Sequence, residues 1–330
     1  MPLLLTTDWF LSNCGDRFAR VVAEARAALQ PVTLPPEGSR LPAEQVEQLE
    51  VAFFHGDFRT DPVFTRRFFG TVLHAPSLRW MHLPNSGVDD PVFSRLQANG
   101  VRLTTSPGAA AEPIAHSAIA GMLALGRGFP HWIDAQRRHA WEEHAAGSTP
   151  RDLPGQTVVL LGVGAIGARI ALLARAFGLH VIGVRRQPHS AGDPVDEIVP
   201  RSSLGDVLPR ADWLIIACPL TEETRGLIDA AALELLQPHA HVINVARGQI
   251  VDEAALIHAL QRRALAGAYL DVFEQEPLPA NSPLWDLPNV LISPHDSGAS
   301  TGNAMRASEL FLHNLSRWLQ GEELLDEVGA

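Results

Sequence analysis

The stretch "TVVLLGVGAIGARIALLARAFG" (residues 157–178) runs from a short apolar segment through a glycine-rich turn into a segment with helical spacing. A GxGxxG that follows a strand and opens a helix indicates a dinucleotide-binding turn. Gly162 permits the tight bend, Gly164 lets a pyrophosphate approach the backbone, and Gly167 lets helix and strand pack closely. The alternative is a turn whose glycines serve packing alone, and an S-adenosylmethionine site fits this spacing less well.

Strand-like and helix-like segments alternate on the C-terminal side of this stretch. The strand-like segments are 180–184, 212–219, 241–246, 267–273 and 289–294. Apolar strands separated by helices predict a parallel, doubly wound α/β sheet. The first hundred residues repeat the pattern more weakly, which predicts a second, smaller α/β domain. A C-terminal helix at about 301–320 could pack on either domain.

Composition narrows the functional classes. The chain has 330 residues, of which 46% are hydrophobic, and a net charge of −11, which argues against nucleic-acid binding. Its start lacks the pattern of a signal peptide, and arginines interrupt its most apolar region, so we expect no membrane span. Two distant cysteines favour a reducing cytoplasm over a disulfide framework.

All the basic residues are arginines. The absence of lysine from the sequence excludes Schiff-base chemistry and a Walker-A phosphate site. It also excludes the Tyr-Lys pair of short-chain dehydrogenases, because that pair needs a lysine. Tyr269 is the single tyrosine in the sequence.

Arg185 and Arg186 follow the strand-like segment "HVIGV", and no Asp or Glu occurs between Leu179 and Gly192. In dinucleotide-binding domains, an acidic residue about 20 positions beyond the glycines usually binds the adenosine ribose. Arg185 takes that place here, and a guanidinium suits the 2′-phosphate of NADPH. We therefore expect two unpaired charges that bind this phosphate; the alternative is a pair of solvated side chains.

Three further residues lie just beyond strand-like segments, where α/β sheets bind ligands: Arg247, Glu276 and His295. The arginine suits a carboxylate, and a Glu beside a His favours the protonated imidazole. Each residue alone could be structural, since the chain has 14 histidines, but three at three strand ends indicate an active site. The clusters "HAH" (239–241) and "EEH" (142–144) lack metal-ligand spacing, so we expect no metal site.

Five motifs together resemble the D-isomer-specific 2-hydroxyacid dehydrogenase family: "LLGVGAIGARIA", "CPLTEETRGLI", "INVARGQIVDEAAL", "GAYLDVFEQEPLP" and "LISPHDSG". The resemblance covers nearly the whole chain. It implies two doubly wound parallel-sheet α/β domains, with a Rossmann cofactor domain (102–296) inserted into a smaller flavodoxin-like substrate domain (1–101 and 297–330).

The resemblance also implies roles for single residues. Arg247 would hold the substrate carboxylate and polarise its keto oxygen, with Glu276 and His295 as the acid–base pair. Ser86 and Gly87 would hold the carboxylate through backbone N–H groups. The implied cofactor-binding residues are Gly162, Gly164, Ala165, Ile166, Gly167, Arg185, Arg186, Cys218, Pro219, Thr224, Val245, Ala246, Arg247, Asp271 and His295.

Two departures from the family pattern stand out: the arginines replace a more frequent Asp, and His116 replaces a more usual acidic residue. Trp141 lies in a stretch that forms a dimerisation arm in the family, which implies a homodimer.

We therefore expect a cytoplasmic reductase of small 2-keto acids that uses NADP(H), with NAD(H) as the alternative cofactor. Two other functions remain open: an NAD(H)-sensing corepressor-like binding protein, and a formate- or phosphite-type dehydrogenase. The formate enzymes carry Gln at the position of Glu276. The sequence does not identify the substrate side chain; His55, Phe58 and Trp285 are candidates to line its site.

Overall fold

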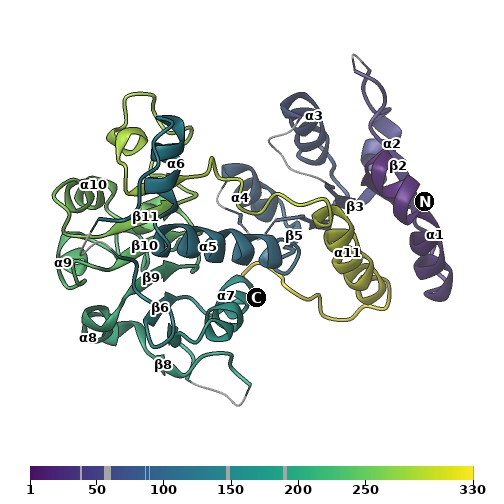
Figure 1. The fold of residues 1–330 in the computed structure, drawn as a ribbon. Helices are drawn as coiled ribbons and strands as arrows, with labels where there is room; N and C mark the ends of the chain where they lie inside the picture. The colour runs from purple at the N-terminus through teal and green to yellow at the C-terminus, as the bar shows by residue number, and fades with distance from the viewer. Residues whose placement is uncertain are drawn as a thin grey trace. The chain divides into compact units, whose positions relative to one another are not determined.

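The computed structural model describes residues 1–37, 39–55, 61–85, 87–88, 90–145, 149–188 and 192–329. The chain folds into two compact units, each with its own parallel sheet (Figure 1). The first unit comprises Met1–Ala110 and Ser300–Ala330, and the second comprises Ala111–Ala299. The second unit is therefore an insertion into the first, as the sequence predicts.

The first unit has a five-stranded sheet in the order β2-β1-β3-β4-β5, and every pair of strands is parallel. This is the flavodoxin-like order. Its strands are β1 (Leu3–Thr6), β2 (Gln30–Thr33), β3 (Leu49–Phe53), β4 (Trp80–His82) and β5 (Arg102–Thr104). Its helices are α1 (Asp8–Glu24), α2 (Ala43–Glu47), α3 (Pro62–Val72), α4 (Pro91–Ala98) and α11 (Asn303–Leu319).

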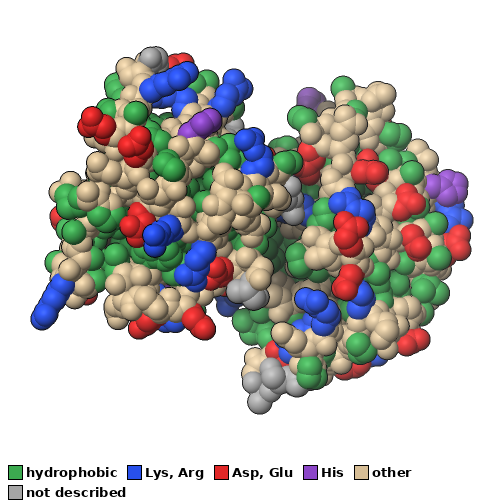
Figure 2. All heavy atoms as spheres, turned by 180° about the vertical axis from the view of Figure 1, so that it is seen from behind, with side chains coloured by type: hydrophobic (Ala, Val, Ile, Leu, Met, Phe, Trp, Pro, Cys, Tyr) green, Lys and Arg blue, Asp and Glu red, His purple; other side chains and the backbone are tan. Residues whose placement is uncertain are grey.

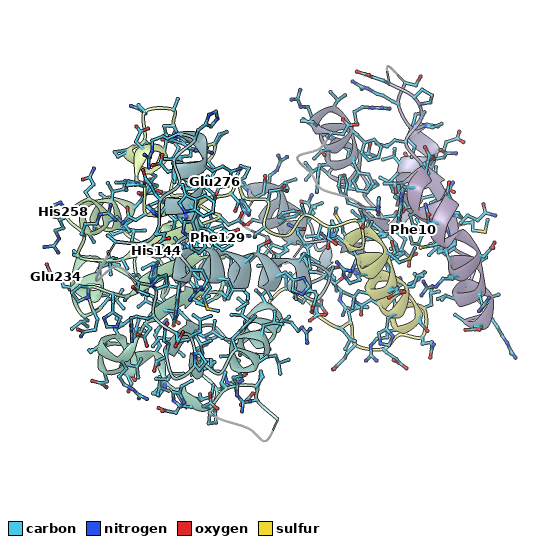
Figure 3. All side chains as sticks on the ribbon, in the orientation of Figure 1. Phe10, Phe129, His144, Glu234, His258 and Glu276 are labelled. Carbon is cyan, nitrogen blue, oxygen red and sulfur yellow. The ribbon has the colours of Figure 1, made fainter. Side chains whose placement is uncertain are left out.

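Alternate strand residues divide the core of the first unit between the two faces of the sheet. Leu3 and Leu5 pack with side chains of α3 and α4, whereas Leu4 packs with side chains of α1 and α11. Phe10 of α1 meets Phe311 of α11 edge to face, with ring centroids 5.4 Å apart (Figure 3 labels Phe10). The C-terminal helix therefore packs on the first unit, as the family resemblance implies.

The second unit has a seven-stranded parallel sheet in the order β12-β11-β10-β9-β6-β7-β8, which contains the Rossmann order. Its strands are β6 (Thr157–Leu161), β7 (His180–Val184), β8 (Glu197–Val199), β9 (Trp213–Ile216), β10 (His241–Asn244), β11 (Gly267–Leu270) and β12 (Val290–Ile292).

Helices cover both faces of this second sheet. Its α-helices are α5 (Ala111–Gly126), α6 (Phe129–Arg137), α7 (Ala165–Ala176), α8 (Leu204–Val207), α9 (Ala230–Glu234) and α10 (Glu253–Gln261). Short 3₁₀ turns lie at Arg201–Ser203, Leu208–Arg210, Gly248–Ile250 and Pro283–Asp286. One core joins the strands to α5 and α7, and the other joins them to α8, α9 and α10.

The boundaries of the units differ from the expected ones. The expected boundary at 101/102 would place β5 in the cofactor domain, but β5 pairs with β4 in the first sheet. The first unit consequently continues to Ala110 and resumes at Ser300 rather than at residue 297.

Acidic and basic side chains are interspersed over the face shown in Figure 2. The described residues also form surface ion pairs such as Arg138–Glu142, at 2.8 Å. None of the helices in the described residues is long and apolar enough to cross a membrane. Both cysteines are free and buried, Cys14 in the first unit and Cys218 in the second.

A buried histidine ends β4. His82 is fully buried, its Nδ1 lies 2.7 Å from Thr104 Oγ1, and its Nε2 lies 2.9 Å from Ser106 Oγ. Because Ser106 donates its own proton to the Leu83 carbonyl (2.9 Å), His82 must donate to it through Nε2 and accept at Nδ1. These bonds fix a neutral tautomer, and burial lowers the pKa of His82 to about 3.

This histidine should make the protein sensitive to acid. Between pH 6.5 and about 3 the unfolded chain binds a proton at His82 that the folded protein excludes. The free energy of unfolding should therefore fall on acidification, by about 1.4 kcal/mol per pH unit for one such group. Urea titrations at pH 7.0 and 5.5 measure this fall, which should be smaller in His82→Gln than in the wild type. The exposed His313 provides the control, and a fall as large in His82→Gln as in His313→Gln would contradict the assignment.

Candidate active site

The glycine-rich turn between β6 and α7 has room for a ligand on one side only. Gly162 has φ +98°, and a Cβ on it would lie 2.7 Å from the Cys218 backbone. A Cβ on Gly167 would lie 2.0 Å from the Gly162 carbonyl oxygen, whereas one on Gly164 would meet no described atom within 4 Å. No side chain caps the first turn of α7, so its N–H groups remain open to an anion. The turn therefore fits a dinucleotide pyrophosphate.

Cys218, Pro219 and Thr224 follow β9 beside this turn. Burial raises the pKa of the Cys218 thiol to about 11, so the thiol stays protonated and unreactive. The Thr224 hydroxyl donates to the Pro219 carbonyl (2.7 Å) and accepts from the Thr221 N–H (2.8 Å). These contacts shape the turn after β9, while the predicted contacts of these residues with a cofactor stay predictions.

Arg185 is not an unpaired charge. Its Nη1 and Nη2 donate to Asp193 Oδ1 (2.9 Å) and Oδ2 (2.6 Å), and the guanidinium also donates to the carbonyls of Gln187 and Pro188. The expectation of two free arginines is therefore wrong for Arg185, because Asp193 lies one residue beyond the acid-free window and pairs with it. Arg186 is exposed and has no hydrogen bond or ion pair to another described residue.

His295 and Glu276 form the pair that the sequence predicts. They lie in the loops after β12 and β11, and His295 Nδ1 is 2.6 Å from Glu276 Oε2. Because a carboxylate only accepts, Nδ1 carries the proton of this bond. Burial alone would raise the pKa of Glu276, but the hydrogen bonds from His295 and the Phe273 N–H (3.0 Å) outweigh it, and the pKa lies below its usual value.

Asp271 holds the loop that carries His295. It is 2% exposed, and its Oδ1 accepts from Ser293 Oγ (2.5 Å), the Asp296 N–H (2.9 Å) and the Ser297 N–H (2.9 Å). Its Oδ2 accepts from the Ser297 hydroxyl. The His295 N–H donates to the Asp271 carbonyl (2.7 Å), which helps to hold His295 at φ +52°, a left-handed conformation that costs free energy outside glycine.

The family resemblance implies a different role for Asp271, a contact with the cofactor, and that contact stays a prediction. In the sequence, the serines on both sides of "PHD" are the feature that could have indicated a loop that binds a buried carboxylate from another strand end.

Arg247 follows β10, between the buried residues Val245 and Ala246 and the 3₁₀ turn at Gly248–Ile250. A Cβ on Gly248 would lie 1.9 Å from the Phe273 backbone, so glycine allows the loops after β10 and β11 to touch. Arg247 Nη1 donates to the Ala246 carbonyl (2.7 Å), and its charge acts on Glu276. The arginine therefore belongs to the same group of strand ends as the His–Glu pair.

The catalytic and cofactor residues predicted in this unit all come from one edge of its sheet. They follow the carboxyl ends of β6, β7, β9, β10, β11 and β12. Parallel sheets bind ligands at this edge. Among the described residues, no group of three or more His, Cys, Asp or Glu could hold a metal ion.

The structure describes only some of the residues predicted to contact the substrate. Ser86 and Phe58 lie outside the described residues, and Gly87 belongs to the first unit. Trp285 is 50% exposed and donates through Nε1 to the Pro279 carbonyl (2.9 Å), within its own loop.

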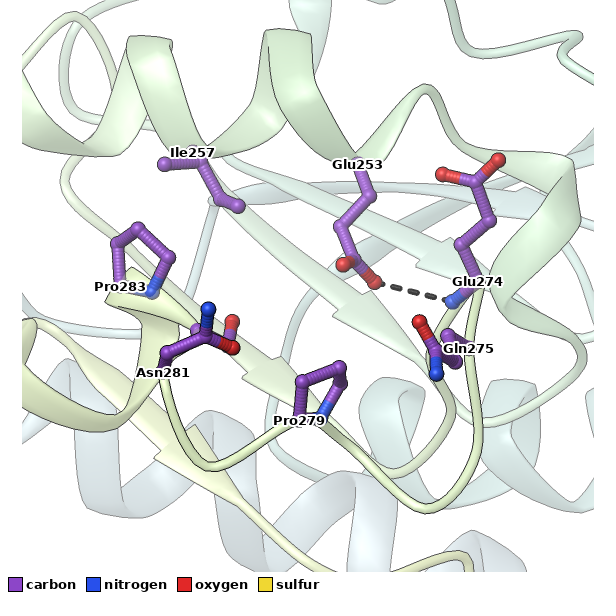
Figure 4. Close-up of a pocket in the computed structure, with 8 residues that line it drawn as sticks. Glu253, Ile257, Glu274, Gln275, Pro279, Asn281 and Pro283 are labelled. Carbon is purple, nitrogen blue, oxygen red and sulfur yellow. Dashed lines mark hydrogen bonds between the residues drawn. The ribbon is translucent and has the colours of Figure 1, made fainter.

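An open pocket of about 450 Å³ lies on the second unit (Figure 4). Glu253 crosses it to accept from the Glu274 N–H (3.0 Å). Its lining includes none of the three catalytic candidates, so we do not assign it to the substrate.

Comparisons with known proteins agree with this architecture. Residues 119–297 match the model of the D-isomer specific 2-hydroxyacid dehydrogenase NAD binding domain. The glyoxylate reductase of Korarchaeum cryptofilum is 33% identical over 268 residues, which cover 80% of this chain and 78% of that protein.

Two solved structures are similar over nearly the whole chain. A D-isomer specific 2-hydroxyacid dehydrogenase from Xanthobacter autotrophicus, in complex with NADPH and MES, has a TM-score of 0.77 and 29% identity over 99% of this chain and 97% of that one. An NADPH-dependent glyoxylate/hydroxypyruvate reductase from Sinorhizobium meliloti, with NADP and malonate, has a TM-score of 0.72 and 29% identity over the same shares.

The chain belongs to the D-isomer-specific 2-hydroxyacid dehydrogenase family. It is an NAD(P)-dependent oxidoreductase that acts on CH–OH groups.

The charge of Glu276 should determine the pH range in which the protein reduces its substrate. Because a neutral amide no longer attracts positive charge to the group that it contacts, Glu276→Gln should move the pH at which the reduction rate falls by half to a lower value. Rates measured between pH 5 and 9 test this shift. Glu274→Gln, which removes an exposed carboxylate from the same loop, should leave the profile in place. Equal profiles for the two variants would count against the role of Glu276.

Proposed function

We propose that this protein reduces a small 2-keto acid to the D-2-hydroxy acid. The observation that carries the proposal is the 2.6 Å contact between His295 and Glu276 at the sheet edge that also carries Arg247 and the glycine-rich turn. The bound nicotinamide cofactor supplies the hydride, and the protein supplies the proton and the orientation of the substrate.

Each side chain has a separate task. Arg247 pairs with the substrate carboxylate through its forked donors and stabilises the charge that develops on the keto oxygen. His295, protonated, gives the proton on Nε2 to that oxygen while hydride reaches the carbon. Glu276 keeps the imidazole protonated and holds its orientation through Nδ1. In the reverse direction, the neutral imidazole takes the hydroxyl proton.

Two alternatives keep the same fold. A corepressor-like sensor would bind the nucleotide without turnover, and a formate- or phosphite-type dehydrogenase would oxidise a smaller acid. The carboxylate of Glu276 favours the keto-acid reductase, since formate enzymes carry Gln at that position. NADPH and NADH consumption with 2-keto acids, and reduction of NADP and NAD with formate and phosphite, separate the three functions.

We also propose a homodimer. Phe129, Trp132 and Ile133 on α6 are each more than a third exposed, and Trp141 is 97% exposed. Exposed apolar groups of this size indicate a protein contact, and the family resemblance favours a second copy. The molar mass of the protein in solution tests this proposal.

His295→Ala should lower kcat by about 10²- to 10⁴-fold, the usual contribution of a positioned general acid. Cofactor binding, followed by the fluorescence of the nicotinamide, should remain. His258 is an exposed histidine on α10, and His258→Ala should behave as the wild type. Near-normal turnover in His295→Ala would refute the assignment of the general acid.

The preferred cofactor on this proposal is NADPH, and Arg186 is the residue that binds its 2′-phosphate. Arg186 follows β7, where an acidic residue would otherwise bind the ribose, and its guanidinium is exposed. Arg185 is already neutralised by Asp193, at 2.6 Å, so it serves the loop more than the phosphate. Two of the similar structures described above bind NADPH or NADP.

Arg186→Gln should weaken binding of 2′,5′-ADP about 10- to 100-fold and leave 5′-AMP unchanged, because one hydrogen bond to a charged group is lost. Isothermal titration of the two nucleotides measures this without turnover. Arg262→Gln, an exposed arginine at the end of α10, is the control. If the wild type binds both nucleotides equally, NADPH is not the preferred cofactor.

A further inference from the structure

Tyr269, the single tyrosine of the chain, places a hydroxyl inside the core of the second unit. It lies on β11, two residues before Asp271, and is 7% exposed. Its ring packs in the core that contains side chains of α5 and α7. A Cβ on Gly121 of α5 would lie 2.5 Å from Tyr269 Cδ1, so glycine at that position makes room for the ring. A phenylalanine would fill the same space, and the hydroxyl therefore requires a separate explanation.

This hydroxyl is the first donor in a chain that ends at a buried carboxylate. The Tyr269 hydroxyl oxygen lies 2.8 Å from Ser293 Oγ, which in turn lies 2.5 Å from Asp271 Oδ1. Because a carboxylate only accepts, Ser293 uses its single proton for Asp271 and accepts from Tyr269. Each donor in such a chain polarises the next, so the tyrosine strengthens the hydrogen bond from Ser293 to the carboxylate.

The surroundings keep the proton on the tyrosine. The pKa of Tyr269 lies above its usual value because burial disfavours the phenolate; the hydrogen bond with Ser293 opposes this rise, and the negative charge of Asp271 adds to it. The hydroxyl is therefore protonated and able to donate at neutral pH.

The carboxylate at the end of the chain holds the segment that follows His295. Asp271 Oδ1, the oxygen that accepts from Ser293, also accepts from the N–H groups of Asp296 and Ser297, both at 2.9 Å. One oxygen thus joins the hydroxyl chain to the backbone beside His295. If the bond from Ser293 weakens, this oxygen can move, and the backbone beside His295 moves with it.

Helix α5 contacts both parts of this network. Ser117 donates to the Ser297 carbonyl (2.8 Å), and Gly121, one helical turn further on, lies against the ring of Tyr269. All of these residues belong to the second unit. The same face of one helix therefore supports both the tyrosine and the loop that it acts on.

We propose that Tyr269 is a positioning residue for the proton transfer: its hydroxyl, through Ser293, fixes the Asp271 carboxylate and thereby the place of the His295 ring. The inference rests on the proposed function, in which His295 gives its proton to the keto oxygen. The role requires no contact of Tyr269 with substrate or cofactor.

Tyr269→Phe, which keeps the ring and removes only the hydroxyl, tests this role. With glyoxylate or hydroxypyruvate, whichever the wild type reduces faster, kcat should fall about 2- to 10-fold, because a displaced imidazole transfers its proton less well. KM and the dissociation constant of the cofactor should stay as in the wild type. Ser308→Ala is the control: it removes a buried hydroxyl of the first unit, which donates to the Ala304 carbonyl (2.8 Å), and should leave kcat unchanged.

A double-mutant cycle shows whether the hydroxyl acts through Ser293. Ser293→Ala removes the link to Asp271 and should lower kcat about 10- to 100-fold, because a charged group loses a hydrogen bond. Tyr269→Phe added to this variant should lower kcat no further, because the route from Tyr269 to Asp271 is already broken. A hydroxyl that served packing alone would give the same fold loss in both backgrounds.

The outcomes are distinct. A wild type that reduces no 2-keto acid with either cofactor overturns the proposed function and this inference together. An active wild type overturns the inference alone if Tyr269→Phe keeps a normal kcat, or if its loss is equal in the two backgrounds. If Ser293→Ala does not fold, Ser293→Cys, whose thiol is a weak donor and acceptor, takes its place in the cycle under the same criterion.

Discussion

The carboxylate of Asp271 is buried among four hydrogen-bond donors, and all four belong to the segment that carries His295. A buried charge is stable only when such donors surround it, so the segment cannot move away without leaving that charge unpaired. This constraint fixes the backbone of His295 in a left-handed conformation and brings its ring to Glu276. The proposed chemistry thus depends on a residue that is itself only 2% exposed.

Much of this arrangement could be predicted because parallel sheets place their ligands at one edge. The glycines at 162, 164 and 167 mark one strand end through the turn they allow, and Arg247, Glu276 and His295 mark others through their charge and chemistry. These residues then lie at one edge of the second sheet, because its strands all run in the same direction and each residue follows the carboxyl end of its strand. The pattern of the C-terminal helix is compatible with either sheet; the family resemblance assigns it to the first domain, and Phe311 packs against Phe10 there.

Other features could not be predicted from local sequence patterns, because they depend on contacts that form only when the chain is folded. Arg185 meets Asp193, eight residues later, and no rule of periodicity pairs those positions. The stack of Trp9 on His55 joins the first turn of α1 to a residue just beyond β3, 46 positions later in the sequence. The expected boundary at 101/102 falls at the start of β5, and the pairing of β5 with β4 in the first sheet shows that the first unit continues beyond it.

Three histidines show that the groups around an imidazole, and not the residue type alone, determine its chemical properties in this protein. His82 is enclosed by hydroxyls and aromatic rings, which hold it neutral and make it a structural element. His55 is neutral for a related reason, burial against an indole, but its buried Nε2 has no hydrogen-bond partner among the described residues. His295 lies beside a carboxylate, with Nδ1 2.6 Å from Glu276 Oε2. The same residue type therefore has three different environments: hydroxyls around His82, an indole against His55 and a carboxylate beside His295. Of these three environments, only the last suits the general acid of the proposed function.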